Sequence, residues 1–176
     1  PANLGNFLPL QFDEGQGFSC AASKEGKLKC WGVNEFGQLG AGDKKLRGNS
    51  EDSIGDKLKV IALPNALQNF AVGQAHVCAI LKNKTLHCFG RGDKGQLGSE
   101  DIKNIGDDAG EVSVVAKLGV NFEPLMVGSG TDFNCVLGKN AQIKCFGKNN
   151  RGQLGIGSTA NVGDQKNSMG EFLKTV

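Results

Sequence analysis

The chain has 176 residues, and its 20 basic and 18 acidic side chains leave a formal net charge of +2. So small and evenly spread a charge argues against binding to nucleic acid, which depends on neutralising many phosphates. Hydrophobic residues make up 39% of the chain, enough for a packed core, and no apolar run approaches the about 20 residues that cross a bilayer. We therefore expect a folded domain with no nucleic-acid partner and no membrane span.

The chain contains three copies of one pattern. WGVNEFGQLG at 31–40 returns as FGRGDKGQLG at 89–98 and as FGKNNRGQLG at 146–155. Two cysteines precede each copy at the same spacing: Cys20 and Cys30, Cys78 and Cys88, Cys135 and Cys145. The repeat units are expected at approximately 1–56, 57–107 and 108–164, with 165–176 starting the next unit.

A looser echo follows each copy, beginning at Ile54, Ile105 and Val162. Its distance from the GQLG motif is longer in the first unit than in the other two. This difference predicts a polar surface insertion between Ala41 and Ser53.

Each cysteine pair lies in a segment where apolar and polar residues alternate. In the second unit the apolar set shares one face of a predicted hairpin, namely Cys78, Ile80, Leu86 and Cys88. The hairpin loops centre on Glu25, Asn83 and Asn140, and Gly26 supplies the residue that can adopt a left-handed conformation. No segment shows sustained helical spacing. The chain is predicted to be all-β.

A single hairpin cannot bury its apolar face, so the units must stack on one another. At this repeat length each unit fits one sheet of four antiparallel strands, which favours the blade of a β-propeller. Trp31, Phe89 and Phe146 occupy equivalent positions and are expected to fill the space between adjacent blades.

The pattern C-A-x-x-x-x-G-x-L-x-C-W-G-x-N-x-x-G-Q-L-G, complete from Cys20 to Gly40, resembles the repeat of the regulator of chromosome condensation family. That superfamily also includes β-lactamase inhibitor protein II. The resemblance implies a seven-bladed propeller, of which this chain supplies about three blades. It implies little about function, because one propeller scaffold hosts many binding activities. The name-giving member's activity would be nucleotide exchange on a small GTPase.

Three blades alone would leave apolar flanks and strand edges uncovered. We therefore expect the chain to be a single propeller segment, 1–176, of a longer polypeptide, which its start at Pro1 also indicates. The alternative is a partner subunit that covers the open ends.

The two cysteines of each hairpin are expected to lie directly opposite one another, close enough for a cross-strand disulfide. The alternative is three pairs of buried thiols that pack as small apolar side chains. Three identical pairs with no cysteine left over favour disulfides, and disulfides indicate an oxidising, extracytosolic location: secreted, at the cell surface or lumenal. The sequon Asn83-Lys84-Thr85, at a hairpin tip, is a candidate glycosylation site.

Residues that could carry chemistry are few. His76 and His87 lie near Cys78 and Cys88, but these cysteines are expected to be paired and His87 to face outward. The carboxylates of Asp107, Asp108 and Glu111 could offer oxygen ligands to calcium, but they lack the spacing of a dedicated loop. Zinc is disfavoured because the chain has no C-x-x-C spacing. We therefore predict no enzyme, no cofactor and no metal. The repeated glutamines are expected to form structural hydrogen bonds: Gln38, Gln96 and Gln153.

Function is expected to be that of a non-catalytic protein–protein interaction module with an unidentified protein partner. The predicted contact regions are Ala41 to Ser53 and Gly110 to Asn134, since loops on rigid scaffolds carry function. One alternative is a structural accessory subunit of a larger assembly, including one associated with a membrane. A more distant one is a guanine-nucleotide exchange factor.

Overall fold

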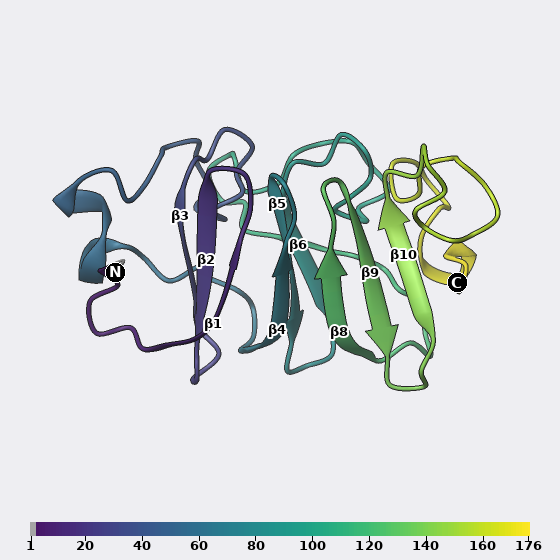
Figure 1. Cartoon of the computed structure of the whole chain (residues 1–176), viewed down its shortest axis with the longest axis horizontal. Coiled ribbons are helices and arrows are strands. Elements are labelled where there is room, and N and C mark those ends of the chain that lie inside the picture. Colours follow the sequence, from purple (N-terminus) through teal and green to yellow (C-terminus); the bar gives the residue numbers. More distant parts are fainter. Residues whose placement is uncertain (1–2) are drawn as a thin grey trace.

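The computed structural model describes residues 3–176 as three antiparallel sheets that stand side by side in chain order (Figure 1). The first sheet contains β1 (Pro9–Glu14), β2 (Phe18–Ser23) and β3 (Leu28–Gly32). The second contains β4 (Leu67–Val72), β5 (His76–Leu81), β6 (Leu86–Gly90) and β7 (Val114–Val115). The third contains β8 (Pro124–Ser129), β9 (Phe133–Gly138) and β10 (Ile143–Gly147). The all-β prediction is confirmed, and the sheets are blades of a partial propeller.

A fourth strand is present in the second sheet alone of the three described sheets. In the first sheet its place is taken by one hydrogen bond, from the Ile61 N–H to the Leu28 carbonyl. In the third sheet Thr175 forms an isolated bridge with Lys144. Three short 3₁₀ turns lie in the connections, η1 (Glu51–Ser53), η2 (Gly55–Lys57) and η3 (Gly170–Phe172). Neither contact forms a strand with its own residue range, so the structure does not define where one repeat unit ends and the next begins. The limits of the repeat units therefore stay a prediction.

The central hairpin of each sheet has the predicted register. Each cysteine lies directly opposite its partner: Cys20 and Cys30, Cys78 and Cys88, Cys135 and Cys145. One position in each hairpin loop is left-handed, with φ of 78° at Gly26, 66° at Lys84 and 62° at Ala141. Glycine thus occupies this position in the first loop alone of the three.

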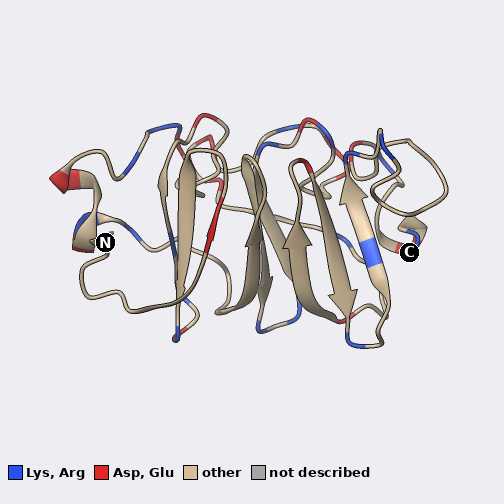
Figure 2. Cartoon of the chain, in the orientation of Figure 1, with Lys and Arg blue, Asp and Glu red and all other residues tan. Residues whose placement is uncertain are grey.

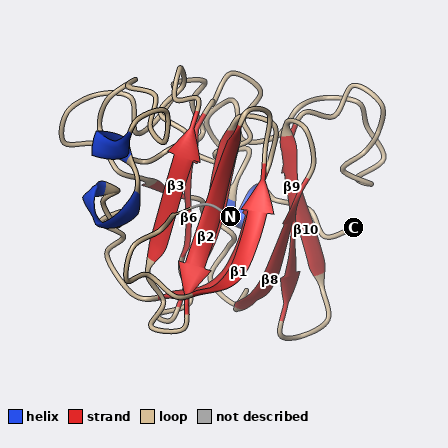
Figure 3. Ribbon diagram, turned by 60° about the vertical axis from the view of Figure 1, so that its left-hand side comes forward, coloured by secondary structure: helices blue, strands red, loops and turns tan. Residues whose placement is uncertain are grey.

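Two apolar cores lie between adjacent sheets. Figure 3 shows the strands of these sheets from a second side. Phe89 belongs to the core between the first and second sheets, and Phe146 to the core between the second and third; both are fully buried. Trp31 is only partly buried, because it lies on the side of the first sheet that faces away from the second. The prediction that aromatic residues fill the space between blades is confirmed for Phe89 and Phe146 and wrong for Trp31.

The predicted insertion between Ala41 and Ser53 is wrong. Arg47 bridges Gly32 in the first unit, as Ile105 and Val162 bridge the equivalent glycines of the other two. The connections that precede these bridges therefore have the same length in all three units. The residue equivalent to Ile105 is therefore Arg47 and not Ile54. The resemblance of the sequence at Ile54 to that at Ile105 arose by chance, and a search for an apolar residue could not find the charged Arg47.

No helix in residues 3–176 is long and apolar enough to cross a membrane.

The hairpin loops give a stability prediction. Ala141 is exposed and left-handed, a conformation that costs a residue with a Cβ about 1–2 kcal/mol. Ala141→Gly should therefore raise the free energy of unfolding by about 1 kcal/mol, measured by urea denaturation. The matched control is Ala160→Gly, in an exposed loop where φ is not positive, which should leave stability equal or lower. A loss of stability on Ala141→Gly would contradict the prediction.

Candidate functional site

The long connections that follow β3, β6 and β10 gather at one end of the three sheets (Figure 1). We call this surface the loop end; it consists of residues 33–46, 91–104 and 148–161, which lie before the three bridge residues. The opposite end carries the short hairpin loops. We take the loop end as the candidate site because its three loops share a frame of internal hydrogen bonds. They differ in the two residues that precede the GQLG motif, which we call the tips.

The repeated glutamines support the frame. The side-chain oxygen of each glutamine accepts a hydrogen bond from the backbone N–H two residues before it, at 2.9 Å for Gln38, 2.8 Å for Gln96 and 2.9 Å for Gln153. The leucine that follows each glutamine is fully or almost fully buried: Leu39, Leu97 and Leu154. The prediction that these glutamines form structural hydrogen bonds is confirmed.

A buried asparagine crosses the loop in two of the units. Asn34 accepts from the Leu39 N–H at 2.9 Å and donates to the Asp43 carbonyl at 2.6 Å. Asn149 makes the same two bonds in the third unit, at 3.0 and 2.9 Å. The second unit has Gly92 at this position, and its N–H donates to the side chain of Asn104, as the Asn149 N–H of the third unit donates to that of Asn161. Each loop is therefore fixed from within, independently of its exposed side chains.

Neighbouring loops also hold one another. The Gly42 N–H donates to the Gly106 carbonyl of the next unit at 3.0 Å. A Cβ atom at Gly37 would lie 2.4 Å from the backbone of residues 106 and 107, and one at Gly95 would lie 2.5 Å from the Asp164 nitrogen. The first glycine of the GQLG motif, Gly37 in the first unit and Gly95 in the second, therefore allows the backbone of the next unit to pack closely against the loop.

The loop tips differ from one unit to the next. The two residues before the GQLG motif are Glu35-Phe36 in the first unit, Asp93-Lys94 in the second and Asn150-Arg151 in the third. Many of the chain's charged residues lie in these loops, with both signs mixed (Figure 2). The loop end therefore presents an aromatic, an ion-paired and a basic tip side by side.

The second tip is held by ion pairs. Arg91 lies 2.7 Å from the Asp93 carboxylate, and its guanidinium stacks over the Phe36 ring of the first tip at 5.3 Å. Burial alone would raise the pKa of Asp93, but hydrogen bonds from Arg91 and Gln96 lower it below its usual value. The carboxylate is thus kept ionised, and Arg91 connects the first two tips.

The carboxylates of Asp107, Asp108 and Glu111 do come together, with one oxygen of each within 4.8 Å of the others. Two of them already have partners, since Lys44 lies 3.1 Å from Asp107 and the Gly106 N–H donates to Glu111 at 3.1 Å. These contacts explain the cluster as part of the contact between adjacent loops, and we assign no metal to it.

The second predicted contact region, Gly110 to Asn134, is mostly structural. It contains β7, β8 and the start of β9, and several of its apolar side chains belong to the core between the second and third sheets. The apolar side chains that it buries there are Ala116, Leu118, Phe122 and Val127. It is therefore not a free contact loop.

The cysteine pairs lie on the face of each sheet that points toward the next unit. The structure joins their sulfur atoms at 2.05, 2.06 and 2.11 Å in chain order. The first two pairs are buried in the cores between sheets, whereas Cys135 in the third pair is only half-buried. Formation of the three disulfides in the protein stays a prediction, as does glycosylation of Asn83, which lies exposed at its hairpin tip.

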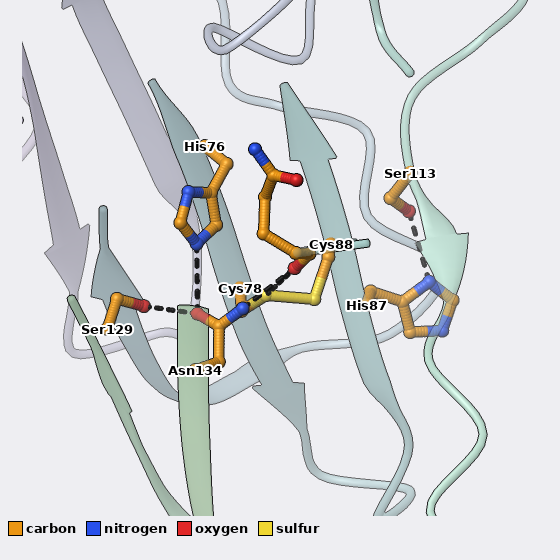
Figure 4. The surroundings of a disulfide bond; sticks show 8 residues. His76, Cys78, His87, Cys88, Ser113, Ser129 and Asn134 are labelled. Atoms are coloured by element: carbon orange, nitrogen blue, oxygen red, sulfur yellow. Dashed lines mark hydrogen bonds between the residues drawn. A yellow bond between two sulfur atoms is a disulfide. The ribbon is translucent and has the colours of Figure 1, made fainter. Parts of the chain in front are cut away.

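His76 and His87 lie on opposite sides of the second disulfide and do not form a catalytic pair with it (Figure 4). His76 is fully buried, and its Nε2 donates to Asn134 Oδ1 at 3.0 Å. Asn134 is also bonded by Ser129, at 2.6 Å, and donates to the Gln96 carbonyl at 2.7 Å. Because protonation would place a charge on the buried Nδ1, which has no partner within residues 3–176, burial lowers the pKa of His76 to about 4.

His87 was expected to face outward, and this is wrong. It points away from the disulfide, but the segment that leads into β7 covers it and Ser113 Oγ lies 3.0 Å from its Nδ1. Burial lowers the pKa of His87.

Two lysines occupy the position equivalent to His87 and were not identified from the sequence. Lys29 and Lys144 extend along the sheet, donate to main-chain carbonyls and lie over phenylalanine rings at 5.3 and 5.4 Å. The carbonyls belong to Leu4, Gly55 and Leu118, and the rings to Phe7 and Phe122. Strand alternation places them on the face away from the cysteines, and the chain segments that enter and leave each sheet cover this side.

The comparisons with known proteins agree with the repeat architecture. The family model for the regulator of chromosome condensation (RCC1) repeat matches residues 15–38 and 68–96. The Protein RCC2 homolog of Xenopus laevis is 32% identical over 164 residues, which cover 90% of this chain and 30% of the relative. Among solved structures, human WBSCR16 has a TM-score of 0.71 at 16% identity, over 96% of this chain and 39% of that chain. Prp20p from Saccharomyces cerevisiae has a TM-score of 0.66 at 21% identity, over 89% and 37%.

The predicted extracytosolic location is wrong. The relatives include RCC2 proteins of several vertebrates, and these are intracellular. The prediction rests on the cysteine pairs, with the sequon at Asn83 as an agreeing sign. The chain spans less than a third of the length of the RCC2 relatives, so these relatives do not establish its activity.

The buried histidine gives a prediction on pH. The pKa of His76 is about 4 in the folded chain and about 6.5 in an unfolded one, so the unfolded state binds more protons between these values. Stability should therefore fall as the pH drops from about 6.5 toward 4, by up to about 1.4 kcal/mol per pH unit from this group. The equivalent residues are Phe18 and Phe133, so His76→Phe should remove this part of the dependence.

Urea denaturation at several pH values compares wild type with His76→Phe. Carboxylate titration is common to both chains, so the difference between them isolates His76. Equal slopes in the two chains would contradict the assignment.

The burial of the cysteine pairs predicts the order of reduction. A dithiol added to dilute native protein should reduce Cys135–Cys145 before the other two pairs, because a reductant must reach the sulfur atoms. Alkylation with a light reagent, followed by denaturation, full reduction and alkylation with a heavy reagent, identifies the reduced pair by peptide mass. Six free thiols before any reduction would contradict the disulfides, and equal reduction rates would contradict the ordering.

Proposed function

We propose that this chain, which belongs to the regulator of chromosome condensation repeat family, is a non-catalytic module that binds a protein partner through its loop end. The observation that carries the proposal is the contrast between frame and tip. Glutamine, asparagine and leucine side chains, most of them buried, fix loops of equal length, while the solvent-accessible tips differ in every unit. A scaffold of this kind can vary its contact residues without changing its fold.

The tips fit a protein surface of mixed character. Phe36 offers apolar area, Arg151 an exposed guanidinium, and Lys94 an ammonium beside Asp93. Aromatic and arginine side chains are enriched among the residues that dominate protein interfaces. Acidic and basic groups are mixed in the first two loops, and the third adds only Lys148 and Arg151, so the surface lacks the uniform positive charge that binding to phosphate backbones requires.

Nucleotide exchange does not follow from the fold. The published structure of Prp20p concerns its binding to Gsp1p and histones, but at 21% identity the likeness to this chain carries the fold alone. The loop-end proposal needs no exchange activity, because it depends only on the geometry of residues 33–46, 91–104 and 148–161.

The test changes the three tips together. Phe36→Ser, Lys94→Ser and Arg151→Ser remove the large side chains from equivalent, solvent-accessible positions. The matched control changes three exposed lysines of the opposite end, which also occupy equivalent positions: Lys24→Ser, Lys82→Ser and Lys139→Ser. Proteins cross-linked to wild type in extract are identified, and the affinity of each purified candidate is then measured for all three chains.

At least one partner should bind wild type and the control equally, and bind the tip variant about tenfold or more weakly. Both variants should melt close to wild type. Equal losses in the tip variant and the control, or full retention by the tip variant, would refute the loop end as the binding surface.

A further inference from the structure

A pocket lies next to β7, the edge strand of the second sheet, where the second unit meets the third. Its volume is about 390 Å³, and its apolar wall includes Ala116, Leu118 and Phe122. Val115 and Val120 also line it, and they are 46% and 77% exposed. Both units that enclose the pocket belong to this chain, so its walls are complete without a further sheet.

The third unit closes the pocket through η3. The Gly170 N–H donates to the Lys117 carbonyl at 2.9 Å, and the Val120 N–H donates to the Glu171 carboxylate at 2.7 Å. Phe172 follows directly in η3 and is 65% exposed. We define the flank patch as this pocket together with the exposed apolar side chains beside it: Val115, Val120 and Phe172.

The same frame occurs a second time, in the first unit. There the Asn6 N–H donates to the Asp56 carboxylate at 2.8 Å, which repeats the bond that fixes Val120. Asn6 thus occupies the position of Val120, and it is exposed. Lys57 in η2 occupies the position of Phe172 in η3 and is exposed as well. Because this frame accepts polar residues at both positions, the fold does not require the apolar side chains of the flank patch.

The flank patch has the properties of a contact surface that is complementary to itself. Apolar side chains that gather on a surface without need from the fold mark interaction sites. The patch offers both a projecting aromatic ring, Phe172, and an apolar pocket beside it. Charges of both signs border the pocket, namely Lys117 and Glu171. Lys117 lies 3.2 Å from Glu100, but its side chain is 67% exposed, and so exposed an ion pair is weak enough to be exchanged for another.

We propose that two copies of this chain associate through their flank patches about a two-fold axis. Phe172 of each copy would enter the pocket of the other, and Lys117 of each copy would face Glu171 of the other. A two-fold axis brings the same patch of both copies together, so association ends at the dimer. The inference is independent of the loop end, because the flank patch lies outside residues 33–46, 91–104 and 148–161.

The first test replaces the apolar residues by those of the first unit. The double variant Val120→Asn with Phe172→Lys should keep its fold, because the first unit holds asparagine and lysine in the same frame. Ile102→Asn is the matched control, since Ile102 is also an exposed apolar residue but lies outside the patch. Thermal melting checks that all variants are folded, and sedimentation of the full chain measures mass over a wide range of concentration.

Wild type and Ile102→Asn should form a dimer as concentration rises, and the double variant should dimerise about tenfold or more weakly. Wild type that stays monomeric throughout would overturn the proposal. So would a double variant that associates as strongly as wild type, because the contact would then lie on another surface.

The second test exchanges the charges. Lys117→Glu and Glu171→Lys should each weaken dimerisation, because each variant places like charges opposite one another across the two-fold axis. An equal mixture of the two variants should restore it, since both contacts of the mixed dimer then join opposite charges. A mixture that associates no better than either variant alone would refute the two-fold arrangement.

Discussion

The structure depends on the packing of each sheet against its neighbours on both faces. A sheet of three or four short strands has two faces and too few residues to bury either one by itself. In the second sheet one face enters the core with the first sheet and the other enters the core with the third, and every residue of β5 and β6 is buried as a result. The first and third sheets have one such neighbour each, and their outer faces are correspondingly more exposed.

This constraint explains which features could be predicted from the sequence. The hairpins, the opposed cysteines and the glutamine bonds are local, and each follows from a pattern within about twenty residues. The stacking of the sheets could also be predicted, because a repeat with one apolar face needs an adjacent repeat to cover that face. The burial of Trp31, Phe89 and Phe146 depended on their position in the stack as well as on their type, so equivalent residues have different surroundings.

What could not be predicted involves chain segments that cover the sheets from outside. Strand alternation assigns Lys29, His87 and Lys144 to solvent, but the segments that lead into and out of each sheet bury or partly bury them. The bridge between Arg47 and Gly32 could not be predicted either, because it uses main-chain atoms and leaves no apolar pattern in the sequence. The predicted extracytosolic location was wrong because it was inferred mainly from the cysteines. Whether two cysteines lie opposite one another depends on the geometry of the hairpin as much as on the surrounding redox conditions.

Three sheets of the same strand order create a further problem, since any sheet could pack on any other. The chain distinguishes its two internal contacts by the residues at one pair of positions. In the first contact Phe18 packs in the same core as Val77, whereas in the second the equivalent positions hold His76 and Asn134, joined by a hydrogen bond. Exchanging the partners would bury His76 against an apolar side chain and leave its donor unsatisfied, at a cost of about 1–3 kcal/mol.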